Sequence, residues 1–170
     1  REQQAQLNQA GELRARLQQQ GEKLSTAQRA LLESEIQAAE ERAKLLRWDI
    51  RLAAIDDELA NWEGLADSRD ADSRRIQEGL RQLLALRGEL RETGDLLERR
   101  LELLGQQRSL ATDQEPGGAS DIRLREQRNQ VLAELEQTLR QRRDALREQR
   151  DRLERVRERL ESAYEQRTRQ

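Results

Sequence analysis

Apolar side chains recur at alternating steps of three and four residues through the middle of this chain, and the repeat does not slip for almost thirty residues. Its positions are Ile76, Leu80, Leu83, Arg87, Leu90, Gly94, Leu97, Leu101 and Leu104. This spacing places the side chains on one face of a helix, so it predicts a long helix packed lengthwise against others. The same pattern recurs on either side. The predicted fold is all-α, an elongated antiparallel coiled coil or three-helix bundle.

The flanking helices carry apolar seams of their own. In the first, one ladder consists of Leu32, Ile36, Ala39, Ala43, Leu46, Ile50 and Ala53, and a second of Leu31, Ala38, Leu45, Leu52 and Leu59. An apolar face this wide indicates that the helix touches two neighbours. In the third, the seam consists of Leu132, Leu135, Leu139, Leu146, Leu153, Val156, Leu160 and Ala163. Polar Arg142 and Gln149 interrupt it; they either fix its register at a cost in stability or mark a more exposed stretch.

The composition favours narrow packing stripes over a thick core. Only 34% of the 170 residues are hydrophobic and 2% are aromatic, whereas 39% are charged. A chain this polar could be disordered. Disordered segments have no reason to keep a helical period, however, so the regular spacing favours bundled helices.

Two linkers divide the bundle into arms at about residues 26–62, 73–110 and 121–167. The first linker, residues 64–72, begins at Gly64, which is expected to end the first arm as a C-cap. It closes with Asp70, Asp72 and Ser73, each of which can cap the next helix.

The second linker, residues 111–120, holds the only proline of the chain. Pro116 is followed by two glycines, and this combination cannot lie inside a helix. Ser120 or Asp121 is expected to cap the third arm.

Residues 1–22 are expected to form a helical extension of the bundle, which comprises residues 23–170. Ser25 and Gln28 have the spacing of a capping box, which predicts a helix start near residue 25. A spacing of seven nevertheless runs straight across it, through Leu17, Leu24 and Leu31. The sequence favours a continuous helix here, and both readings remain open.

The sequence offers few residues that could support catalysis, cofactor binding or metal binding. The chain has no His and no Cys, so it lacks the usual general bases, thiol nucleophiles and soft metal ligands. Its carboxylates lie among arginines at helical spacing, which is typical of solvated, ion-paired faces. We therefore expect a non-enzymatic protein with no cofactor and no metal.

Two tryptophans and three glycines stand out within the arms. Trp48 and Trp62 lie two heptads apart on one face of the first arm, where they either fill space against a neighbouring helix or anchor a partner or a membrane interface. Gly79, Gly88 and Gly94 interrupt the second arm at a cost of about 1 kcal/mol each relative to Ala. Gly94 falls on the seam itself, where it marks a close helix approach, a bend or a tolerated weak point.

The charge pattern does not favour a nucleic-acid partner. Net charge is −2, and the 32 basic and 34 acidic residues are interspersed rather than gathered into a basic stripe. All basic residues except Lys23 and Lys44 are arginine, which suits lateral ion pairs between helices but also follows from a GC-rich genome. No run approaches the roughly 20 apolar residues that span a bilayer.

The order of these features resembles a known family. Trp48 precedes the ladder Leu52–Ile55–Leu59, an acidic turn and the helix with Leu83 and Leu90. Then come Arg100-Leu101-Glu102-Leu103-Leu104-Gly105, the Pro/Gly-containing gap and an Arg-rich helix. From about Trp48 to Arg159 the chain is similar to the N-terminal periplasmic coiled-coil region of large bacterial mechanosensitive channels of the small-conductance (MscS-like) superfamily.

The resemblance implies a soluble arm on the periplasmic side of the bacterial inner membrane, in a homo-oligomeric ion channel that responds to osmotic stress. Its partners would be other protein helices, and the membrane would be reached only through segments outside this chain. The alternative is a coiled-coil scaffold or adaptor, in the cytoplasm or the cell envelope.

Overall fold

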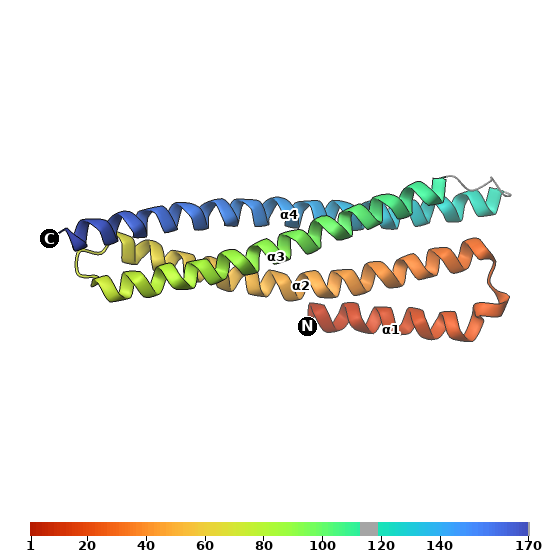
Figure 1. The fold of residues 1–170 in the computed structure, drawn as a ribbon. Helices are drawn as coiled ribbons and strands as arrows, with labels where there is room; N and C mark the ends of the chain where they lie inside the picture. The colour runs from red at the N-terminus through yellow and green to blue at the C-terminus, as the bar shows by residue number, and fades with distance from the viewer. Residues whose placement is uncertain (113–118, 170) are drawn as a thin grey trace. The chain divides into compact units, whose positions relative to one another are not determined.

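The computed structural model describes residues 1–112 and 119–169, and almost all of them are helical (Figure 1). The elements are α1 (Glu2–Gln20), the single 3₁₀ turn η1 (Gly21–Lys23), α2 (Thr26–Asp67), α3 (Ser73–Thr112) and α4 (Ala119–Thr168). These described ranges contain no strand. The predicted all-α helical bundle is confirmed.

The helix does not continue across residues 21–25, so the continuous reading favoured by the sequence is wrong. Leu24 is extended, with φ −85° and ψ 139°, which breaks the helical path. The capping box is present instead: Ser25 Oγ accepts a hydrogen bond from the Gln28 amide at 3.2 Å, and Gln28 Oε1 accepts one from the Ser25 amide at 2.9 Å. These two hydrogen bonds satisfy backbone N–H groups that have no partner within the helix at its N-terminus. They favour a new helix start over the continuous helix that the heptad spacing predicted.

The first linker is shorter than expected because α2 does not end at Gly64. The helix continues for almost one more turn, to Asp67, and this turn buries Leu65. At the other side of the linker, Asp72 Oδ1 accepts a hydrogen bond from the Arg75 amide at 2.8 Å. Asp72 is therefore the cap of α3 among the three candidates.

The second predicted linker, residues 111–120, falls largely outside the described residues. Residues 113–118, with Pro116 and its two glycines, lie outside the described residues. α4 already begins at Ala119, so Ser120 and Asp121 lie within its first turn rather than at the cap position. Asp121 still favours the helix there, because a negative charge near the N-terminus complements the helix dipole.

The chain divides into two compact units, and α2, α3 and α4 each contribute a segment to both. Unit 1 consists of Arg1–Asp49 and Arg99–Arg140; unit 2 consists of Ile50–Glu98 and Gln141–Gln170. This division does not fall at residue 22, where the sequence placed the boundary between an extension and the bundle.

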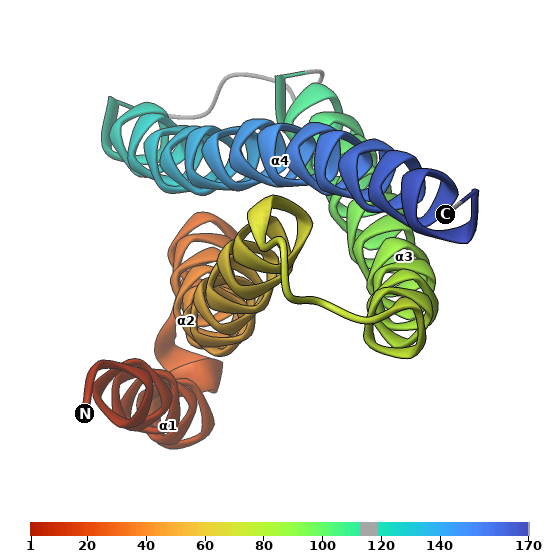
Figure 2. The same ribbon diagram turned by 90° about the vertical axis from the view of Figure 1, so that its left-hand side faces the viewer.

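Unit 2 is a three-helix bundle whose segments alternate in direction. Arg51 of α2 pairs with Glu89 of α3, and the Trp62 ring lies at Gly79, so these two segments run antiparallel. α4 runs antiparallel to α3 and parallel to α2, as Figure 1 also shows. The side chains at its centre are at most 1% exposed: Ile55, Leu59, Ile76, Leu83, Leu90, Leu97, Leu146, Leu153, Val156 and Leu160. Figure 2 looks along these helix segments from the end of this unit.

Unit 1 contains four helical segments because α1 packs against α2. Arg14 of α1 forms an ion pair with Glu40, and Ala10 is buried. Three alanines of α2, at positions 38, 39 and 43, are only 1% exposed. Small side chains there let neighbouring helices approach closely, so this part of α2 is covered on more than one side, as its wide apolar face predicts.

Two neighbouring leucines of α3 test the seam. Leu83 is fully buried, whereas Leu84 is 61% exposed. We expect Leu83→Asp to lower the free energy of unfolding by more than about 3 kcal/mol, because it places an unpaired charge among packed side chains. Leu84→Asp makes the same chemical change at a hydrated position and is the matched control. Circular dichroism melts measure both; equal melting temperatures for the two variants would contradict the seam.

Two glycines of α3 test the helix approach. A Cβ at Gly79 would lie 2.9 Å from Trp62 Cε3, whereas one at Gly88 would meet no atom within 4 Å. We expect Gly79→Ala to destabilise the protein, because the rigid indole must move. Gly88→Ala should raise the free energy of unfolding by about 1 kcal/mol through helix propensity alone. If denaturant melts show that both substitutions stabilise, the close approach at Trp62 is wrong.

Candidate functional site

The candidate site predicted from the sequence is the packing seam, and the structure buries most of it. Of the predicted seam residues, those that are less than 10% exposed are Leu32, Ile36, Ile76, Leu83, Leu90, Leu97, Leu101, Leu104, Leu132, Leu135, Leu139, Leu146, Leu153, Val156 and Leu160. Fully burying one such side chain contributes about 1.5–3 kcal/mol. The seam therefore provides the main apolar contribution to folding in each unit.

Ile50 is a correction to the predicted seam, because its side chain is 71% exposed. In unit 2, α2 packs against α3 and α4 through the side that carries Ile55 and Leu59. Ile50 is not on that side, and its side chain faces solvent. Leu46 and Leu80 are half-buried, at the edge of the seam rather than in it.

A second correction concerns the middle of α3. Arg87 occupies a step of the predicted ladder but is exposed, whereas Leu86 is 4% exposed. The spacing 83–86–90 also consists of steps of three and four, so the periodicity allowed either path. The apolar side chain of Leu86, next to the charged Arg87, is the sequence feature that favours Leu86 as the seam residue.

The two tryptophans both contact α3 of their own chain. Trp48, in unit 1, receives the Arg100 guanidinium over its ring, 4.8 Å from the ring centroid. Arg100 Nη1 also lies 2.9 Å from Glu41 Oε2. The ring of Trp62, in unit 2, lies close to Gly79, where an added Cβ would be 2.9 Å from Trp62 Cε3. Both indoles are half-buried, and these contacts favour space filling within the bundle over the partner-contact hypothesis.

Gln149 places a polar group inside the seam of unit 2. Its side chain is 7% exposed, and its Nε2 donates hydrogen bonds to the Leu52 carbonyl oxygen at 2.7 Å and to Asp56 Oδ1 at 3.0 Å. Its Oε1 is buried with no hydrogen-bond partner among the described residues. A shift of α4 along α2 would leave the amide without its acceptors, so Gln149 favours one register. Arg142, the other polar seam position, is half-buried.

Unit 1 has a buried carboxylate that the seam pattern did not reveal. Glu136 of α4 is 6% exposed and pairs with Arg108 of α3 and with Arg140 one turn along its own helix. Both carboxylate oxygens are engaged, so the buried charge is compensated. Ser34 is also buried, donates to the Ala30 carbonyl oxygen at 3.0 Å and accepts from Arg128 Nε at 3.2 Å.

Arginine–glutamate pairs join the helices of unit 2 at its rim. Arg152 of α4 holds Glu63 of α2 through Nε at 3.1 Å, and Arg51 of α2 holds Glu89 of α3 through Nε at 2.6 Å. The arginine hydrogen bond lowers the pKa of Glu63, and the same effect from Arg51 lowers the pKa of Glu89. Glu63 and Glu89 in turn raise the pKa of Arg152 and Arg51. Because all four groups reach solvent, each pair contributes at most about 1 kcal/mol.

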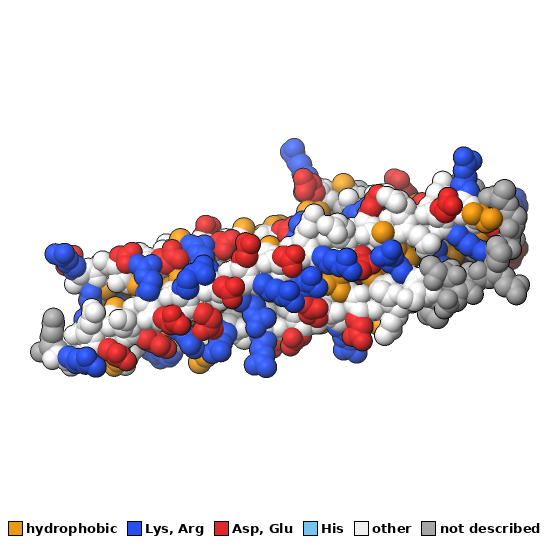
Figure 3. All heavy atoms as spheres, turned by 90° about the horizontal axis from the view of Figure 1, so that it is seen from above, with side chains coloured by type: hydrophobic (Ala, Val, Ile, Leu, Met, Phe, Trp, Pro, Cys, Tyr) orange, Lys and Arg blue, Asp and Glu red, His pale blue; other side chains and the backbone are white. Residues whose placement is uncertain are grey.

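The outer surface is charged and mixed. Figure 3 shows basic and acidic side chains interspersed over one face, with small and scattered apolar areas. Within the described ranges there is no group of acidic or metal-ligating side chains that could hold a metal ion. No helix among them is long and apolar enough to cross a bilayer.

Comparisons with known proteins give no match: no family model, no curated protein and no solved structure is significantly similar to this chain.

The pair between Glu63 and Arg152 predicts a pH dependence. Because the folded-state pKa of Glu63 is below its ordinary value of 4.5, the pair stabilises the protein above that value and loses its contribution as the pH falls through the folded pKa. We expect Glu63→Gln to be less stable than the wild type at pH 7 and to lose less stability on acidification. Exposed Glu158→Gln is the control and should follow the wild type. Parallel curves of melting temperature against pH for Glu63→Gln and the wild type would contradict this.

Proposed function

We propose that this chain is a non-enzymatic structural module that spaces and assembles a larger protein. The observation that carries the proposal is the seam of α3, in which Ile76, Leu83, Leu90, Leu97 and Leu104 are at most 3% exposed, whereas most of the residues on its other faces are charged or polar. Packed helices of this kind provide surfaces for other helices. Its polar contacts, at Gln149 and Glu136, hold helices to one another.

The proposal extends to a location. The order of features from about Trp48 to Arg159 resembles the periplasmic coiled-coil region of MscS-like mechanosensitive channels. We propose that the module is the periplasmic arm of such a homo-oligomeric channel in the bacterial inner membrane, acting in osmotic stress through assembly, spacing or regulation. The chain itself would conduct no ions. A cytoplasmic or envelope scaffold is the competing function and differs in the compartment.

Single cysteines distinguish the two compartments, because the chain has no cysteine of its own. Ala60 of α2 is exposed and Ala39 is 1% exposed. We expect Ala60→Cys, introduced into the gene that encodes the chain, to react with a membrane-impermeant maleimide in intact cells with a permeabilised outer membrane. Ala39→Cys is the matched control and should react only after denaturation. Cells without the gene should also survive osmotic downshock less well.

The contrary result is equally clear. If Ala60→Cys reacts only after the inner membrane is lysed, and loss of the gene leaves downshock survival unchanged, the periplasmic channel arm is wrong. The cytoplasmic scaffold would then be supported.

A further inference from the structure

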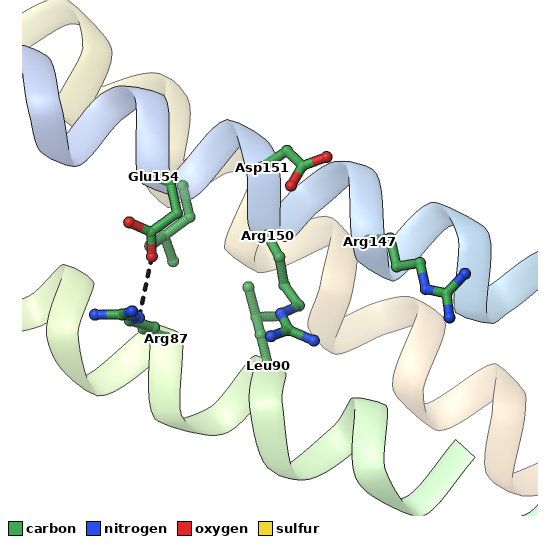
Figure 4. A pocket seen from close by; sticks show the side chains of 7 residues that line it. Arg87, Leu90, Arg147, Arg150, Asp151 and Glu154 are labelled. Carbon is green, nitrogen blue, oxygen red and sulfur yellow. Dashed lines mark ion pairs between the residues drawn. The ribbon is translucent and has the colours of Figure 1, made fainter. Parts of the chain in front are cut away.

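Three arginines line a recess between α3 and α4 of unit 2. The recess has a volume of about 260 Å³ and is lined by Arg87, Leu90, Arg147, Arg150, Asp151, Leu153 and Glu154 (Figure 4). Leu90 and Leu153 are at most 1% exposed, so the floor is apolar and closed to water from beneath. The positive groups are spread along a recess that has one apolar wall, and an anion held against that wall would be less screened by water.

Arg150 has no ion pair or hydrogen bond within the described part of the chain. Figure 4 shows its side chain reaching from α4 toward Leu90 of α3, while the Asp151 carboxylate lies beside α4 and away from α3. Arg150 Nη1 lies beside Gly94 of α3, where an added Cβ would be in ordinary van der Waals contact with it at 3.6 Å. Arg150 is exposed, so its five N–H donors reach solvent at the recess and meet no competing protein acceptor among the described residues.

The other two arginines are only partly neutralised. Arg87 Nε lies 3.0 Å from Glu154 Oε1, and Glu154 is shared with Arg157. Arg147 Nη2 lies 3.0 Å from Glu98 Oε1, and Glu98 is shared with Arg143. Exposed ion pairs of this kind are weak, so both guanidinium groups can turn to a more highly charged ligand.

We propose that this recess binds a phosphate group, either as inorganic phosphate or as the phosphate ester of a small molecule. Arginine forks donate paired hydrogen bonds to phosphate oxygens, and a tetrahedral dianion can accept from several directions at once. A carboxylate ligand carries one negative charge, the same as each of the Glu98 and Glu154 side chains that already pair with these arginines, so it would have no advantage over them. The site is independent of the compartment in which the protein acts, so it goes beyond the proposed function.

Isothermal titration of the full chain at low ionic strength tests the site, with inorganic phosphate and phenyl phosphate as probes and acetate as the carboxylate control. We expect saturable binding of at least one phosphate probe and none of acetate. Arg150→Gln and Arg87→Gln should each weaken phosphate binding by about tenfold or more, since each removes a charge-assisted donor group. Binding of phenyl phosphate alone would identify an ester as the ligand.

Arg155→Gln is the matched control, because Arg155 is exposed on the same helix, carries the same charge and does not line the recess. Its affinity for phosphate should stay within about twofold of the wild type. Circular dichroism of all three variants shows whether the fold is intact. The proposal is overturned if neither phosphate probe binds saturably, if acetate binds as tightly, or if Arg155→Gln loses as much affinity as Arg150→Gln.

Discussion

The removal of leucine side chains from water between three helices is the interaction on which each unit depends. No single helix could supply it: the apolar stripe of α3 is narrow, and its other faces are charged. Seam leucines such as Leu83 and Leu153 are almost fully buried, and each contributes about 1.5–3 kcal/mol that is available only when neighbouring helices are in place. The ion pairs at the rim are individually weak, so they adjust the packing rather than create it.

Polar groups inside the seam fix the register in which the helices pack. Because leucines recur every three or four residues along the seam, a helix that slipped along its neighbours could still bury leucine against leucine. Gln149 disfavours a slipped register, because its side-chain amide would then lose its hydrogen bonds to the Leu52 carbonyl oxygen and to Asp56. Glu136 in unit 1 has a comparable role, since both of its oxygens need arginine donors from specific positions. Gly79 of α3 lies close to the Trp62 ring of α2, and a larger residue at this position would clash with the ring. This contact adds a steric constraint on how α2 and α3 pack.

The sequence predicted the helices and most of the seam because both follow from local spacing. It also revealed the capping box at Ser25, although the heptad spacing across Leu24 was given more weight. What it missed depends on neighbours. Ile50 has the same periodicity as Ile36, but only Ile36 is covered, and no local signal distinguishes them. Arg87 and Leu86 differ by one step of a pattern that permits both. The recess around Arg150 requires knowledge of which faces of α3 and α4 meet.

Residue-level amide hydrogen exchange tests most directly whether tertiary packing holds these helices. Within each unit, the amides of α2, α3 and α4 that lie along the seam should exchange at least about a thousandfold more slowly than in an unstructured chain. They should lose this protection together as denaturant is added. The account would be contradicted if these helices exchanged at nearly unprotected rates, or if each lost its protection independently of the others, because buried leucine layers couple them in every unit.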